Sequence, residues 1–176
     1  MRNIIYKYQL IVYKSETLGT KNENSYFAID ESLFGHRDGK PIWIIDAINT
    51  QAKAFRLEGV NERNAVIIKN FINKYIETSN NIFTEGWSGY NFLNNNINYN
   101  HITHIHGGRD FGFGIQSTSH IESLWSILKS NIKSCYHVIP NKNIIKFIME
   151  AEFKYNLRGK NNGDKIQSIF DAFKLI

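Results

Sequence analysis

The sequence predicts an α/β fold with a mixed five-stranded sheet and flanking helices. Three strand-like stretches follow one another through short polar links, and such links imply an antiparallel meander. Apolar residues then recur at helical spacing, and two further strand-like stretches alternate with the helices this spacing predicts. An order in which antiparallel strands precede alternating helices and parallel strands indicates an α/β sheet.

Composition and charge limit the classes of protein to which this chain can belong. A chain of 176 residues with 42% hydrophobic content can bury one sizeable core and is not disordered. The net charge of +5 favours a polyanionic partner, although many equally basic domains bind none. The single Cys135 excludes an intramolecular disulfide and lies in no nucleophile pattern. No apolar stretch is long enough to span a membrane, and a reducing compartment is expected: the nucleus in a eukaryotic host, otherwise the cytoplasm.

The elements follow from local patterns. Residues 4–13 form either a short helix or an edge strand, and residues 14–24 form a polar linker. Strands are predicted at 25–34, 41–48, 52–59, 81–84 and 101–106, and helices at 61–77, 90–93, 120–134, 141–156 and 164–174. Asn61 is the candidate N-cap of the first long helix. This order is that of an RNase H-like fold.

Two stretches near the fifth strand carry weaker signals. The glycine-rich residues 107–114 lack the Lys-Ser/Thr ending of a phosphate-binding loop, so they are either an active-site flap or a plain loop. Three histidines lie along the strand: His101, His104 and His106. At most two of them can share a face, and without a third ligand no zinc site is expected.

Three acidic residues occupy positions that this fold brings together. Asp30 lies in the middle of the first strand, Glu85 ends the fourth, and Glu122 begins the helix after the fifth. Carboxylates are unfavourable at half-buried strand positions unless a partner such as a divalent metal pairs with them. The three side chains could hold two Mg²⁺ or Mn²⁺ ions roughly 3.5–4 Å apart, with Asp30 bridging both ions.

Basic residues near these carboxylates suggest a nucleic-acid partner. Lys129 follows Glu122 by nearly two helical turns and therefore shares its polar stripe, together with Lys133. Lys129 is placed to hold a DNA phosphate or a flanking base. Arg37, Arg109 and Lys133 are expected to add phosphate contacts, which give affinity without reading sequence.

Each carboxylate also has a plainer interpretation. Glu122 follows Ser119 at the spacing of a capping box, so it could simply cap a helix. Asp30 could form a salt bridge within the sheet. Glu31 could point into the site in its place, because adjacent strand residues face opposite sides. Glu85 could be only a turn residue.

Three motifs carry a family resemblance. They are Asp30-Glu-Ser-Leu-Phe-Gly35, then Thr84-Glu-Gly-Trp87 with Tyr90, then Ser119-His-Ile-Glu-Ser-Leu-Trp-Ser-Ile-Leu-Lys129. In this order and spacing they resemble the DDE transposases of Merlin elements and their ISXO2-like insertion-sequence relatives. The resemblance covers roughly residues 24–158 and extends to the stretch Phe153-Lys-Tyr-Asn-Leu-Arg158.

The resemblance implies an RNase H-like catalytic domain that cuts double-stranded DNA at element ends and joins them to a target with two Mg²⁺ or Mn²⁺ ions. Carried over, Asp30, Glu85 and Glu122 are the catalytic and metal-binding triad, and Lys129 is the accompanying basic residue. A homodimer is expected from the same resemblance. The implied division is an N-terminal extension at 1–23, the catalytic domain at 24–158 and a C-terminal helical tail at 159–176.

Two departures from the family pattern keep other functions open. Glu85 stands where the family has Asp, and its extra methylene displaces the carboxylate, whereas catalytic constellations tolerate shifts of only about 0.5 Å. No cysteine precedes the first strand, so the usual N-terminal DNA-binding region is not expected, as in a truncated or domesticated copy. The alternatives are an impaired transposase, a non-catalytic DNA-binding protein derived from one, or an RNase H-like nuclease unrelated to transposition.

Overall fold

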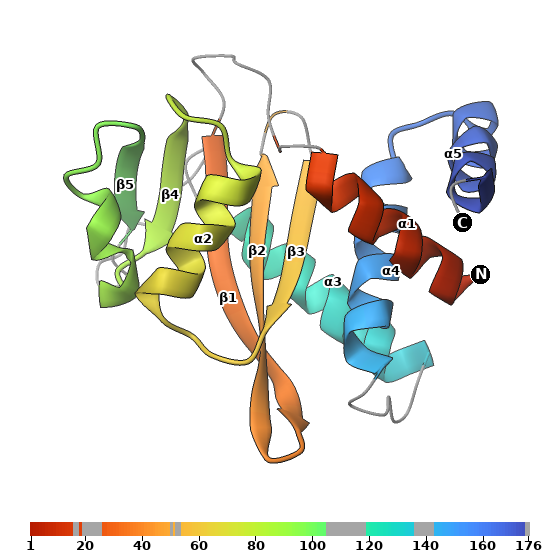
Figure 1. Cartoon of the computed structure of the whole chain (residues 1–176), viewed down its shortest axis with the longest axis horizontal. Helices are drawn as coiled ribbons and strands as arrows, with labels where there is room; N and C mark the ends of the chain where they lie inside the picture. Colours follow the sequence, from red (N-terminus) through yellow and green to blue (C-terminus); the bar gives the residue numbers. More distant parts are fainter. Residues whose placement is uncertain are drawn as a thin grey trace.

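The computed structural model describes residues 1–15, 18, 26–49, 51, 54–104, 119–135 and 143–174, without side-chain placement at 12–15, 37, 104, 119–120 and 131–135. The elements, in chain order, are α1 Arg2–Ser15, β1 Tyr26–Arg37, β2 Lys40–Asn49, β3 Ala54–Val60, α2 Ala65–Tyr75, β4 Asn81–Glu85, the 3-10 helix η1 Ser88–Leu93, β5 Asn100–His104, α3 Ser119–Cys135, α4 Ile144–Leu157 and α5 Asn162–Lys174 (Figure 1).

A five-stranded sheet organises the molecule, with strand order β3-β2-β1-β4-β5. β1 pairs antiparallel with β2, and β2 pairs antiparallel with β3. On its other side β1 pairs in parallel with β4, which pairs in parallel with β5. The predicted mixed sheet is therefore confirmed, and β1 is its central strand.

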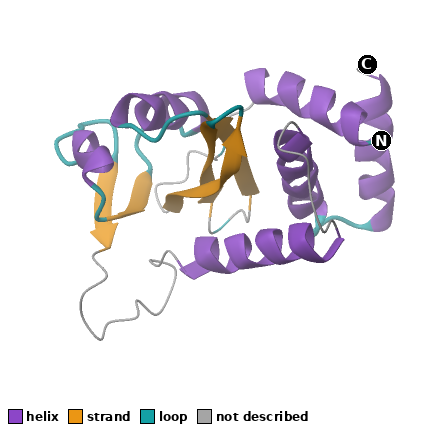
Figure 2. Ribbon diagram, turned by 90° about the horizontal axis from the view of Figure 1, so that it is seen from below, coloured by secondary structure: helices purple, strands orange, loops and turns teal. Residues whose placement is uncertain are grey.

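Helices cover both faces of the sheet, with α2 on one face and α3 on the other (Figures 1 and 2). Alternate residues of β1 supply the two cores: Phe27 and Ile29 pack on the α2 side, and Ala28 packs on the α3 side. Because successive strand residues face opposite sides, the register of β1 decides which acidic residue faces which helix.

Several expected boundaries shift. Residues 4–13, for which helix and strand were both open, are helical within α1. The prediction that Asn61 caps the next helix was wrong, because Asn64 has the extended backbone of a cap and its Oδ1 accepts from the Ile67 N–H at 3.0 Å. The glycine-rich stretch 107–114 and most of the linker 14–24 lie outside the described residues.

Side chains of α4 cover the edge strand β3. The Asn156 amide pairs with both backbone groups of Phe55, accepting at 2.9 Å and donating at 2.8 Å. Glu152 accepts from the Leu57 N–H at 2.8 Å and forms a buried ion pair with Arg56 at 3.6 Å. Helix α4 therefore blocks pairing of a further strand at this edge. Among the described helices, none is long and apolar enough to cross a membrane.

Candidate metal and nucleic-acid site

Asp30 faces α3 from the middle of β1. In the β1–β2 ladder it is paired with Asp46 and shares its face. Ile44 and Ile48, two positions to either side of Asp46 on β2, belong to the core under α3. Glu31 faces the other side, where its carboxylate pairs with Arg63 and accepts from the Tyr90 hydroxyl. The structure therefore places Asp30, and not Glu31, on the α3 face of the sheet.

The surroundings of Asp30 disfavour its charged form. The pKa of Asp30 is raised to about 6, chiefly by burial. A backbone hydrogen bond from Glu31 lowers this pKa, and the nearby charges of Glu31 and Glu85 raise it. Trp125 also lies close enough to favour the carboxylate, although its buried Nε1 makes no well-formed hydrogen bond among the described residues. A cation beside Asp30 would relieve this cost.

Glu85 lies next to Asp30 on the neighbouring strand. The parallel ladder pairs Ala28 with Phe83, both in the core under α3, so alternation places Asp30 and Glu85 on that same face two residues further on. The influence of Glu85 on the pKa of Asp30 agrees with this proximity. The fold thus brings together two of the three predicted metal ligands.

Glu122 lies in the first turn of α3 and is exposed. Helix α3 crosses the Asp30 face, where Trp125, in the turn after Glu122, packs against Phe34 with ring centroids 5.4 Å apart. Within the described part of the chain, no three His, Cys, Asp or Glu side chains lie close enough together to hold a metal ion. Glu122 therefore lies on the helix that adjoins the Asp30 face, and it forms no three-ligand group with Asp30 and Glu85 in the described part of the chain.

Lys129 is the predicted DNA-binding residue whose side chain is described. Its Nζ donates to Ser32 Oγ at 2.8 Å and lies 5.7 Å from the centroid of the Phe34 ring. Ser32 is two positions beyond Asp30 and shares its face, so Lys129 is held at the surface beside the candidate site. Arg109, and the side chains of Arg37 and Lys133, lie outside the described residues.

Asp46 is a component that the sequence analysis missed. It is 0% exposed, and neither carboxylate oxygen has a hydrogen bond within the described residues. Burial, followed by the charges of Asp30 and Glu31, raises the pKa of Asp46 well above its ordinary value. A signal was present, because a lone acid stands inside the apolar run Ile44-Ile-Asp-Ala-Ile48.

A second cluster supports β1 from behind Asp30. The Arg63 Nε donates to Glu31 at 2.5 Å, and its guanidinium lies 3.9 Å from the centroid of the Trp87 ring. Gly89 adjoins the same ring so closely that a Cβ there would clash with it. Trp87 therefore packs between Arg63 and the backbone, and the Tyr90 hydroxyl completes the cluster at Glu31. Trp125, 5% exposed, is likewise a core residue.

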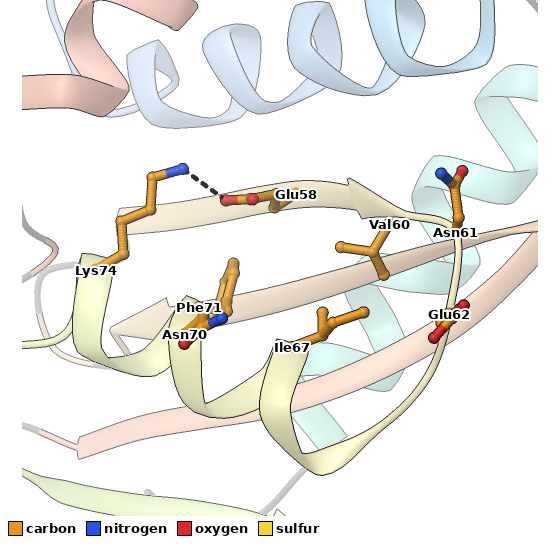
Figure 3. A pocket seen from close by; sticks show the side chains of 8 residues that line it. All are labelled: Glu58, Val60, Asn61, Glu62, Ile67, Asn70, Phe71 and Lys74. Carbon is orange, nitrogen blue, oxygen red and sulfur yellow. Dashed lines mark hydrogen bonds and ion pairs between the residues drawn. The ribbon is translucent and has the colours of Figure 1, made fainter.

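A pocket lies away from these residues. It has a volume of about 500 Å³ and is lined by Glu58, Val60, Asn61, Glu62, Ile67, Asn70, Phe71 and Lys74 (Figure 3). Glu58 and Val60 alternate with Leu57, which belongs to the core under α3, so the pocket opens on the α2 face. Lys74 pairs with Glu58 across it at 3.0 Å.

His101 uses both ring nitrogens in contacts on the α2 side. Nε2 lies 2.8 Å from Thr84 Oγ1, and Nδ1 lies 2.7 Å from Asn94 Oδ1. Burial lowers the pKa of His101, which favours the neutral ring. Its contacts link β4 just before Glu85 to η1, which is a structural role.

A mixed sheet of this strand order, with adjoining carboxylates on β1 and β4, defines an RNase H-like fold. Residues 16–156 match the model of the ISXO2-like transposase domain, so the chain belongs to this family of DDE domains. The resemblance drawn from the three motifs is thereby confirmed. A search among curated proteins finds no match.

A solved structure has a similar fold. The chain is similar to one in the CryoEM structure of the simian T-cell lymphotropic virus intasome in complex with PP2A regulatory subunit B56 gamma, with 14% identity and a TM-score of 0.53. The match covers 84% of this chain and 54% of that one, so the protein spans about half the viral chain. Two structures of the HTLV-2 integrase catalytic core domain in complex with magnesium, in dimeric and trimeric forms, match at 13% identity with TM-scores of 0.48 and 0.49. They cover 78% and 81% of this chain, and 87% and 91% of theirs.

Proposed function

We propose that this chain is a DDE transposase catalytic domain that cleaves DNA strands and transfers them with a divalent metal. The observation that carries the proposal is the adjacency of Asp30 and Glu85 on the α3 face of neighbouring parallel strands. A site that concentrates negative charge, and raises the pKa of its own carboxylate, is suited to a cation. Membership of the ISXO2-like family supports the same reaction class.

The donor set fits magnesium or manganese, because carboxylate oxygens are the ligands that these hard cations prefer. Asp30 would bridge two ions, Glu85 would bind one and Glu122 the other. When bound, the ions would activate a water or 3′-hydroxyl and stabilise the leaving oxygen. Asp30 must lose its proton before it can bind a metal ion.

The basic residues would hold the substrate. Lys129 lies at the surface beside Asp30 and is proposed to bind a phosphate next to the one that reacts. Lys133, Arg37 and Arg109 are proposed to add contacts to the DNA backbone. The partners proposed are double-stranded DNA, as element ends and target, and a second copy of the chain.

A second candidate function is DNA binding without catalysis. The identity of residue 85 favours it, because Glu85 stands where the pattern of the resembling transposases has Asp. For a catalytic domain, Asp30, Glu85 and Glu122 must come together as ligands when metal binds. For a binder no such movement is needed.

Calorimetric titration with Mn²⁺, with DNA present, separates the two functions. Wild-type protein is compared with Asp30→Asn, with Glu122→Gln, and with Glu62→Gln as a control exposed carboxylate on the α2 side. Loss of binding in the first two variants, but not in the control, is the result expected of a catalytic site. Absence of binding in the folded wild type would overturn the catalytic proposal and leave the DNA-binding one.

A further inference from the structure

The β1–β2 hairpin extends beyond the rest of the sheet as a free ribbon. Among the described strands, β3 pairs with β2 only from Trp43 onward, and β4 pairs with β1 only as far as Ala28. From Gly35 to Ile42 the two strands therefore pair only with each other. Figure 1 shows this ribbon projecting past the ends of the other strands.

The ribbon has a defined shape and a fixed base. Its turn residues Asp38 and Gly39 both have positive φ, 53° and 75°, as in the tight two-residue turns that match strand twist. The register shifts between Leu33 and Gly35, a bulge that increases twist and re-aims the strand. Phe34, the residue at this bulge, packs on Trp125 of α3. The arm is thus held against the helix that carries Glu122 and Lys129.

The tip continues the face that carries Asp30. Asp46, Ile44, Ile42 and Lys40 alternate along β2 and so share one side, on which Asp46 opposes Asp30. Lys40 is exposed and is paired in the ladder with Arg37. Asp46 lies six positions along β2 from Lys40, a span of about 20 Å. Lys129, at Ser32, lies between the two ends of this span.

Duplex DNA fits this arm better than a protein strand. Lys40, Pro41 and the bulge at Gly35 are the devices by which exposed strand edges resist pairing with another strand. A two-stranded ribbon fits the width of the DNA major groove, and Arg37 with Lys40 supplies two positive charges at the tip against one from Asp38.

We propose that the ribbon tip, residues 36–41, docks in a groove of duplex DNA about six base pairs from the phosphate held at Asp30 and Glu85. The spacing is the ribbon's span of about 20 Å divided by a rise of about 3.4 Å per base pair. The location of the reacting phosphate rests on the proposed function, and the docking extends the DNA contact proposed there for Arg37 to the whole tip.

Equilibrium binding to a 30-base-pair duplex of random sequence tests the docking. The double variant Arg37→Ala/Lys40→Ala is compared with wild type and with Lys69→Ala, an exposed lysine on α2 that serves as the matched control. The double variant is expected to bind about tenfold more weakly and to reduce the salt slope by nearly 2, whereas Lys69→Ala changes neither. Lys40→Arg should retain wild-type binding. Both positions flank the turn, Lys40 is solvent-exposed, and thermal unfolding verifies that the variants fold.

Hydroxyl-radical footprinting then tests the spacing. Wild type is expected to protect a patch about six base pairs from the Mn²⁺-dependent nick, and the double variant to lose that patch alone. If wild type nicks DNA while the double variant has the same affinity and footprint as Lys69→Ala, the ribbon proposal fails together with the DNA contact of Arg37, and the proposed cleavage stands. If the variant alters only self-association, the ribbon is a protein interface and the proposal is overturned. If wild type binds no duplex, both proposals fall, whereas binding with tip dependence but no nick overturns the catalytic function alone.

Discussion

Asp30 and Asp46 lie directly opposite each other where β1 pairs with β2. Asp46 is fully buried, and the charges of Asp30 and Glu31 add to burial in raising its pKa. Asp30 itself has a pKa raised to about 6. Two carboxyl groups in such proximity cannot both ionise cheaply, so this site carries a repulsion that a proton or a cation relieves.

Replacing Asp46 by Asn is expected to stabilise the protein at neutral pH. The folded state holds the Asp46 proton more tightly than the unfolded chain does, so the folded state binds more protons between the ordinary pKa of 3.8 and the raised one. The free energy of unfolding of the wild type therefore falls as pH rises through this window. An asparagine side chain does not titrate, so the Asp46→Asn variant escapes this loss. Urea unfolding at acidic and neutral pH should show a gain of roughly 1–3 kcal/mol for the variant near pH 7 and little gain near pH 4.

The matched control is Asp38→Asn, an exposed aspartate in the β1–β2 turn where Asn also tolerates positive φ. Its stability should follow wild type at every pH. A difference between Asp46→Asn and wild type that stays constant with pH would contradict a raised pKa at Asp46.

How much could be predicted depends on the range over which each interaction acts. Strand alternation and helical spacing are local, and they gave the sheet and most helices, including α3 with its buried Trp125. The pairing of Asp30 with Asp46 depends on strand register, and that of Arg63 with Glu31 joins residues 32 apart in sequence. Neither can be obtained from local patterns, because each exists only once the sheet is assembled.

Binding of Mn²⁺ is expected to weaken as pH falls through about 6. Metal requires the Asp30 carboxylate, and with its pKa raised to about 6 a proton competes in this range. One competing proton predicts an apparent affinity about tenfold lower at pH 5 than at pH 7. Calorimetry at these two values measures the change. A constant affinity would mean that metal binds elsewhere or that Asp30 is already ionised at pH 5.

Restoring the family residue by Glu85→Asp is expected to increase the rate of Mn²⁺-dependent DNA nicking by roughly tenfold or more. The shorter side chain draws the carboxylate back toward β4, and catalytic geometry tolerates displacements of only about 0.5 Å. Glu85→Gln, which keeps the length but removes the charge, is the control and should lower the rate. Nicking that falls in Glu85→Asp would mean that the rest of the site is adapted to glutamate.

Removing Arg63 should destabilise the support behind Asp30. Arg63→Ala leaves Glu31, whose side chain is only 2% exposed, without its cation, and breaking a buried pair costs about 3–5 kcal/mol. Because the Arg63 side chain is 33% exposed, we expect a smaller loss of about 2 kcal/mol in the free energy of unfolding. The Trp87 ring, which Arg63 covers, should change its fluorescence in the folded variant.

The control is Arg158→Ala, which removes an exposed cation 3.4 Å from the Tyr155 ring centroid. This variant should lose less than about 1 kcal/mol in the free energy of unfolding. Equal losses in the two variants would show that Glu31 does not depend on Arg63, and that the Tyr90 hydroxyl alone satisfies it.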